Sequence, residues 1–182
     1  MLKELKIINS LEFDTVCVYG VGVPSQFFNH IKGDKTGVDS FDTSLFPRSW
    51  SGATIADNIV SKHNKKSYDV VIINNSKHYK DITKYFKQAQ KNIIEGGKII
   101  FTHSMPKVPN DVTETPTKHQ FWCGYVQQFI LELISKGGYK VTTFDEGLGV
   151  SIIEIDETKE PKQIDVQGFE EVYFQRKELM NN

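Results

Sequence analysis

The clearest structural signal in the sequence is the stretch Tyr68-Asp69-Val70-Val71-Ile72-Ile73. Its run of β-branched residues predicts a strand that is covered on both faces, which is the usual state of a strand in a parallel sheet. The rest of the chain alternates similar short apolar runs with helical patterns. Because strands and helices alternate, we expect an α/β fold with helices on both faces of a mostly parallel central sheet.

The same criteria predict the other elements. Strands are expected at residues 15–19, 35–39, 98–102, 139–144 and 150–155, and the last two should form an antiparallel pair that closes the sheet. Helices are expected after Pro24 and at residues 53–63, 82–94, 118–136 and 169–179. Asp81 is expected to cap the helix at 82–94, and Gly96-Gly97 should end it.

Length and composition indicate one globular domain. The chain has 182 residues, of which 38% are hydrophobic and 25% charged, and domains average roughly 150 residues. We therefore expect a single domain over residues 1–182, with a polar tail at 156–182. No apolar run approaches the roughly 20 residues of a membrane-spanning helix, and the first six residues lack the apolar core of a signal peptide. The expected location is the cytoplasm.

Several binding classes are disfavoured by the residue counts. The chain has 22 basic and 23 acidic residues, whereas nucleic-acid binders gain affinity mainly by neutralising phosphates. Arg48 and Arg176 are its only arginines, and arginine is the side chain best suited to grip phosphates and bases. Cys17 and Cys123 lie in apolar and aromatic runs, which predicts small buried thiols rather than a zinc site or a disulfide.

Residues that follow the strands are the candidate ligand site, because α/β sheets bind ligands beyond the carboxyl ends of their strands. Gly20 and Gly22 follow the strand at 15–19 and allow the backbone to approach a ligand closely. Asp39 lies 19 residues after Gly20, close to the offset at which an acid meets ribose hydroxyls. Together they favour a nucleoside-type ligand, although a plain strand-to-helix turn explains the glycines equally well.

Two histidines also follow predicted strands. His78 follows the strand at 68–73, and His103 follows the strand at 98–102. If both face one cleft, either imidazole could accept a proton from a hydroxyl group. The alternative for each is a solvated loop histidine.

Seven stretches occur in an order that is known from one enzyme group. They are Val18-Tyr19-Gly20, Gly37-Val38-Asp39, Thr54-Ile55-Ala56-Asp57, Tyr68 to Tyr79, Gly96 to Ser104, Trp122 to Gln128 and Phe169 to Asn182. The series resembles class I S-adenosylmethionine-dependent methyltransferases, especially the small family-24 type that includes sugar and natural-product O-methyltransferases. The resemblance covers nearly the whole chain and implies a Rossmann-like methyltransferase fold.

The resemblance implies S-adenosylmethionine as cofactor. Gly20 and Gly22 would lie beside its methionine portion, Asp39 would accept its ribose hydroxyls, and Asp57 would lie near its adenine. Asn74 is the further residue expected in the cofactor site.

The resemblance also implies the reaction, which is methyl transfer to a hydroxyl of a small molecule such as a sugar. His103 is the first choice for the base that takes the hydroxyl proton, and His78 is the second. The loop at 105–117 would cover the acceptor.

The chain departs from the family pattern at four polar positions. Val18 replaces an acid, Asn74-Asn75 replaces Asp-Gly, and Ser104 and Tyr125 each replace an aspartate. In metal-dependent relatives, carboxylates at the ends of the two central strands hold a divalent ion. Neutral Asn74 and Ser104 are poor ligands for such an ion, so no metal is expected.

These departures leave a second function class open. In that class the protein is a pseudoenzyme, a catalytically silent structural or interaction subunit with the same fold. The aromatic helix at 118–136, with the Phe121 to Tyr125 segment, would then contact a second copy of the chain or an assembly partner.

Overall fold

The computed structural model describes residues 2–20, 26–38, 53–56, 68–74, 77–113, 122–166 and 168–180. The strands are β1 (Thr15–Tyr19), β2 (Asp34–Val38), β3 (Ala53–Ala56), β4 (Tyr68–Ile73), β5 (Ile93–Thr102), β6 (Tyr139–Phe144) and β7 (Val150–Ile155). The helices are α1 (Leu2–Ser10), α2 (Gln26–His30), α3 (Tyr79–Asn92), α4 (Val126–Lys136), α5 (Phe169–Phe174) and α6 (Arg176–Met180), with a 3-10 turn, η2, at Pro109–Asp111.

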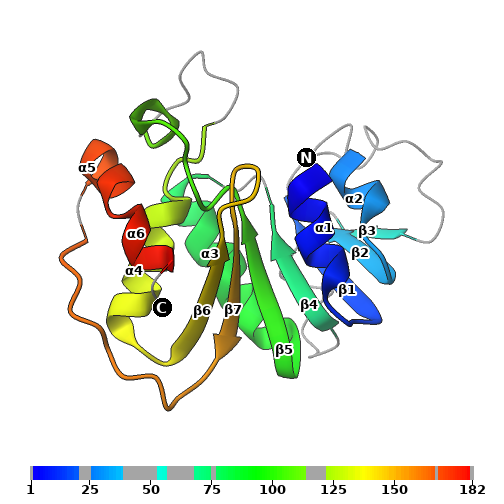
Figure 1. The fold of residues 1–182 in the computed structure, drawn as a ribbon. Helices are drawn as coiled ribbons and strands as arrows, with labels where there is room; N and C mark the ends of the chain where they lie inside the picture. The colour runs from blue at the N-terminus through cyan, green and yellow to red at the C-terminus, as the bar shows by residue number, and fades with distance from the viewer. Residues whose placement is uncertain are drawn as a thin grey trace.

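The strands form one seven-stranded sheet in the order β3-β2-β1-β4-β5-β7-β6 (Figure 1). The pairs from β3 to β5 are parallel, whereas β7 runs antiparallel to both β5 and β6. Helices α1 and α2 cover one face of the sheet, and α3 and α4 cover the other (Figure 1). The predicted fold class, a mostly parallel sheet with an antiparallel closing strand, is confirmed.

Strand β4 lies at the centre of the core, as its β-branched run predicts. Val70, Val71, Ile72 and Ile73 are each at most 1% exposed. Because successive side chains of a strand point to opposite faces, Val71 and Ile73 join the apolar cluster under α3 and α4, while Val70 and Ile72 join the cluster under α1 and α2. Strand β4 is therefore covered on both faces of the sheet.

The helix predicted at residues 53–63 is wrong in its first four residues. Ala53–Ala56 form β3, which pairs in parallel with β2 at the edge of the sheet. Pairing with an open strand edge supplies hydrogen bonds that local helical spacing does not reveal, and β-branched Thr54 and Ile55 suit a strand. Residues 57–63 lie outside the described ranges.

The predicted ends of the helix at 82–94 are also corrected. Helix α3 begins at Tyr79, with His78 at its capping position, so Asp81 lies inside the first turn rather than at the cap. The helix ends at Asn92 because β5 begins at Ile93. Gly97 therefore lies within β5, where a Cβ atom would come within 2.9 Å of the carbonyl oxygen of Asp69.

Residues 118–121 of the helix predicted at 118–136 lie outside the described ranges. Helix α4 begins at Val126 and ends at Lys136, with Gly137 at its C-cap as expected. Its apolar stripe is packed inside this chain: Val126, Phe129, Ile130, Leu133 and Ile134 are each at most 5% exposed. The last predicted helix is divided into α5 and α6, and α1 is a helix that the pattern analysis missed. Both cysteines are buried, as predicted.

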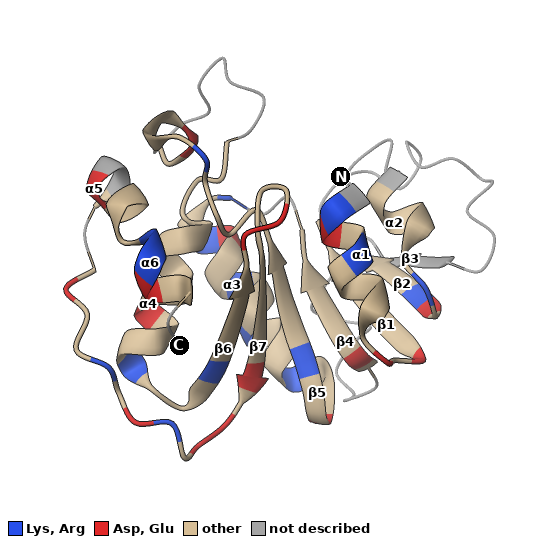
Figure 2. Ribbon diagram, viewed as in Figure 1, with Lys and Arg blue, Asp and Glu red and all other residues tan. Residues whose placement is uncertain are grey.

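Charged residues of the described C-terminal part are mixed in sign. Figure 2 shows Lys and Arg interspersed with Asp and Glu along the tail after β7 and in α6. Within the described ranges, no helix is long and apolar enough to cross a bilayer.

Candidate functional site

The order of the strands reverses direction between β1 and β4. Chain connections lead from β1 outward through β2 to β3, and from β4 in the opposite direction to β5. Ligands of α/β sheets bind at such a switch point, beyond the carboxyl ends of the two strands. In this chain the residues that directly follow β1 and β4 are Gly20 and Asn74.

Gly20 has a backbone φ of +73°, in the left-handed region that favours glycine. Its amide donates to the Val38 carbonyl at 2.9 Å, and the Asn74 amide donates to the Tyr19 carbonyl at 2.8 Å. These bonds extend the sheet by one residue beyond the strands and hold the glycine turn against its neighbours.

Three of the predicted cofactor residues, Gly22, Asp39 and Asp57, lie outside the described ranges. Strands β2 and β3 are parallel to β1, so they end at the same edge of the sheet. The structure describes the chain up to Val38 and Ala56, the residues directly before the two predicted acids.

Asn74 connects the ends of three strands. Its side chain is 3% exposed; Nδ2 donates to the Gly20 carbonyl at 3.1 Å, and Oδ1 accepts from the Thr102 hydroxyl at 2.8 Å. The Thr102 hydroxyl oxygen also lies 3.0 Å from Nδ1 of His103. We refer to this line of Gly20, Asn74, Thr102 and His103 as the strand-end relay. Thr102 is a member that the sequence analysis missed, because it reads only as the last residue of a strand.

His103 occupies an unusual position for a non-glycine residue. Its φ of +61° is the only positive value outside glycine among the described residues, and such a conformation costs on the order of 1 kcal/mol. Burial, together with the nearby positive charge of Lys77, lowers its pKa to about 4. The imidazole is therefore neutral near pH 7 and has a lone pair available.

His78 has different surroundings. It is exposed at the start of α3 and its ring meets the edge of Trp122, with ring centroids 5.1 Å apart. The contacts of the described residues do not join His78 to the strand-end relay. The expectation that both histidines face one cleft stays a prediction.

Around Trp122, the segment before α4 is fastened to the loops that follow β4 and β5. The Lys77 carbonyl accepts from the Tyr125 amide at 2.9 Å, and the Asp111 carbonyl accepts from the Cys123 amide at 2.7 Å. The Lys77 ammonium lies 5.9 Å from the Trp122 ring centroid, and burial lowers the Lys77 pKa. The glycine at position 124 is the sequence signal for this arrangement, because its φ of +57° is a conformation that other residues rarely adopt.

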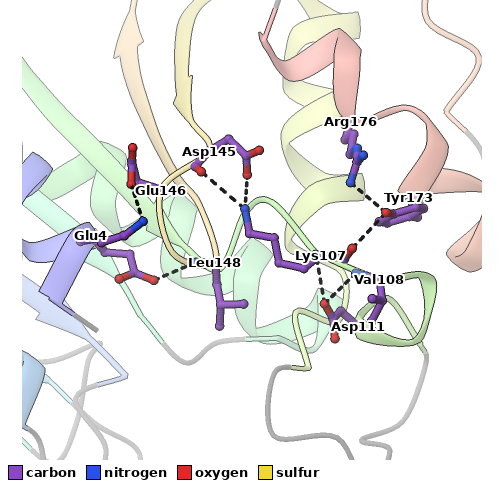
Figure 3. Close-up of polar contacts among 10 residues, drawn as sticks. Glu4, Lys107, Val108, Asp111, Asp145, Glu146, Leu148, Tyr173 and Arg176 are labelled. Carbon is purple, nitrogen blue, oxygen red and sulfur yellow. Dashed lines mark hydrogen bonds and ion pairs between the residues drawn. The ribbon is translucent and has the colours of Figure 1, made fainter.

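The loop after β5 is held on two further sides (Figure 3). Lys107 forms an ion pair with Asp145 from the β6–β7 loop. On the other side, the Tyr173 hydroxyl of α5 donates to the Lys107 carbonyl at 3.0 Å and accepts from Arg176 at 2.8 Å (Figure 3). Within the loop, the buried Asp111 carboxylate accepts from the Lys107 amide at 2.8 Å. The first nine residues of the predicted acceptor loop, 105–113, are thus anchored shortly after β5, and residues 114–117 lie outside the described ranges.

No family model and no curated protein matches this sequence. Among solved structures, an S-adenosylmethionine-dependent methyltransferase from Thermotoga maritima is 18% identical with a TM-score of 0.59, covering 84% of this chain and 87% of that one. A methyltransferase from Podospora anserina, bound to S-adenosylhomocysteine, is 9% identical with a TM-score of 0.56, over 84% and 76%. An O-methyltransferase family protein from Burkholderia thailandensis is 12% identical with a TM-score of 0.56, over 86% and 56%. At these identities the likeness is one of fold, and this chain has the Rossmann-like fold of those methyltransferases.

Proposed function

We propose that this protein is an S-adenosylmethionine-dependent methyltransferase that acts on a hydroxyl of a small molecule, such as a sugar. The observation that carries the proposal is the glycine turn at Gly20, which ends β1 at the switch point of a methyltransferase fold. The order of the family-24-like stretches supports the choice of a hydroxyl acceptor.

The described residues fit such a cofactor. Gly20 has no side chain that would obstruct a ligand beyond the end of β1, and its φ of +73° turns the backbone away from that strand. Gly20 and Gly22 would lie beside the methionine portion, Asp39 would accept the two ribose hydroxyls, and Asp57 would lie near the adenine. Asn74 serves this site by holding the Gly20 carbonyl.

A bound cofactor would supply an electrophilic methyl group on sulfur, and the acceptor hydroxyl that receives it would give up its proton to a base of this chain. His103 is the preferred base because it is neutral near pH 7 and follows the central strand β5. His78 is the second candidate. The loop at 105–113 would help to position the acceptor.

Calorimetric titration with S-adenosylmethionine and S-adenosylhomocysteine tests the proposal. Both should bind, and Asp39→Ala should weaken binding at least about tenfold because a carboxylate that accepts two hydroxyls is lost. Asp34→Ala is the matched control, since this exposed acid begins β2 at the opposite edge of the sheet; it should leave the affinity unchanged.

His103→Ala should slow methyl transfer while leaving cofactor affinity nearly intact, and an unaffected rate would exclude His103 as the base. If neither ligand produces heat at millimolar concentration, the enzyme proposal fails. The alternative, a catalytically silent subunit with this fold, would then be favoured.

A further inference from the structure

We infer that Asn74 and Thr102 are positioning residues that hold His103 in one tautomer, with its proton on Nδ1 and a lone pair on Nε2. The inference deepens the proposed function, and rests on it for the role of His103 as the base. It assigns Nε2 as the atom that accepts the hydroxyl proton.

The first step concerns the orientation of the Asn74 amide. A backbone carbonyl can only accept hydrogen bonds, so the Asn74 atom that faces the Gly20 carbonyl at 3.1 Å must be the donor Nδ2. The other end of the amide, Oδ1, then faces the Thr102 hydroxyl at 2.8 Å. The fixed Gly20 carbonyl thus determines which way the amide points.

The second step concerns the single proton of the Thr102 hydroxyl. Oδ1 of Asn74 can only accept, so Thr102 donates its proton to that oxygen. Toward His103, at 3.0 Å, the hydroxyl oxygen must then act as acceptor, and Nδ1 must carry the hydrogen. A neutral imidazole has only one N–H group, which leaves Nε2 unprotonated.

The third step concerns the charge of the ring. A doubly protonated imidazolium would also donate from Nδ1, but burial and the charge of Lys77 keep His103 neutral near pH 7, although Glu4 acts in the opposite direction. His103 directly follows Thr102 in the chain and has a left-handed backbone, with a φ of +61°. In this conformation its Nδ1 lies 3.0 Å from the Thr102 hydroxyl oxygen. One ring nitrogen is therefore committed to the relay, and the other is the proton acceptor.

The relay also gives a physical reason for an amide at position 74, where the resembled family has aspartate. A carboxylate accepts hydrogen bonds but cannot donate one to the Gly20 carbonyl. Asparagine can donate to Gly20 and accept from Thr102 at the same time. The glycine turn of the cofactor site and the candidate base are thereby connected through one side chain.

Nuclear magnetic resonance on the full chain tests this inference without cofactor or substrate. Histidine is labelled with nitrogen-15, long-range proton–nitrogen correlations are recorded near neutral pH, and the signal of His103 among the five histidines is assigned by its loss in His103→Gln. We expect a neutral ring protonated on Nδ1. Protonation on Nε2, or a charged ring, in the unmodified protein would overturn the inference.

Two variants of Thr102 separate the hydroxyl from the side-chain volume. Thr102→Val removes the hydroxyl and should release the tautomer, with a mixed or Nε2-protonated signal. Thr102→Ser keeps the hydroxyl and should retain protonation on Nδ1. An unchanged Nδ1 signal in a folded Thr102→Val protein would overturn the role of Thr102.

Kinetics distinguishes this inference from the proposed function. If the protein transfers methyl groups, Thr102→Val should lower kcat at least about tenfold and leave cofactor affinity unchanged, whereas Thr102→Ser should preserve most of kcat. A protein that binds no cofactor but shows the expected tautomer would refute the proposed function while supporting the relay.

Discussion

Replacing Asn74 by aspartate tests the strand-end relay through protein stability. The side chain is 3% exposed, and its Nδ2 donates to the Gly20 carbonyl. The introduced carboxylate cannot donate, so the hydrogen bond is lost and the partly buried Gly20 carbonyl is left without this partner, which costs about 1–3 kcal/mol. We therefore expect the free energy of unfolding at neutral pH to fall by about 2 kcal/mol.

The effect of Asn74→Asp should depend on pH. A protonated carboxyl has an O–H group that can donate to the Gly20 carbonyl in place of Nδ2. Burial raises the pKa of the introduced carboxyl above its unfolded value of about 3.9. The loss of stability should therefore be small near pH 4 and should grow as the pH rises. Asn74→Ala loses both hydrogen bonds at every pH, so the loss of stability in this variant should change much less with pH.

Urea denaturation at about pH 5, pH 7 and pH 8 gives the required free energies by linear extrapolation. Each variant is compared with the unmodified protein at the same pH. Asn29→Asp, on an exposed residue, is the charge-matched control and should change stability by less than about 0.5 kcal/mol. If Asn74→Asp is as stable as the unmodified protein at pH 7, or its loss does not grow with pH, the orientation of the amide is wrong.

Three further predictions concern other parts of the site. The pKa of His103 in the folded protein is about 4 against an ordinary 6.5, so up to about 3 kcal/mol of stability is lost as the pH falls from 6.5 to 4. In His103→Gln, urea denaturation at several pH values should show a smaller decrease of stability over this range. An equal decrease in the variant would contradict this prediction. Gly124→Ala should lower stability by more than about 2 kcal/mol, because φ is +57° and the new Cβ would lie 2.3 Å from a carbonyl oxygen; Gly96→Ala, with a similar φ and open space, should cost less in the same thermal melts. Tyr173→Phe removes the donor to the Lys107 carbonyl and should speed amide exchange in residues 105–113, with equal exchange rates counting against the anchoring of that loop.

The central and closing parts of the fold follow from local pattern. The β-branched run of β4 has two-sided burial, and β6 and β7 pair across their glycine-containing turn as predicted. Strand β3 was not predicted, because it is stabilised by pairing with β2. The local spacing of apolar residues at 53–63 does not reveal such pairing. The end of α3 was misplaced because apolar Ile93 continues a helical pattern while it already belongs to β5.

The candidate site was predictable in position but not in its connections. Strand ends located Asn74 and His103, since ligands meet parallel sheets at that edge. The bond between Thr102 and Asn74 joins residues that are 28 positions apart, and no spacing rule reveals it. In the sequence, asparagine at position 74 in place of the aspartate of the resembled family suggests a loss of function. In the structure the amide has two partners that a carboxylate could not both satisfy.

A crystal structure of the protein with S-adenosylhomocysteine tests the central claim most directly. We expect the nucleoside to lie across the carboxyl ends of β1 and β2, beside Gly20, with its ribose hydroxyls on the Asp39 carboxylate. A ligand bound elsewhere, or side chains filling the space beside Gly20, would contradict the account.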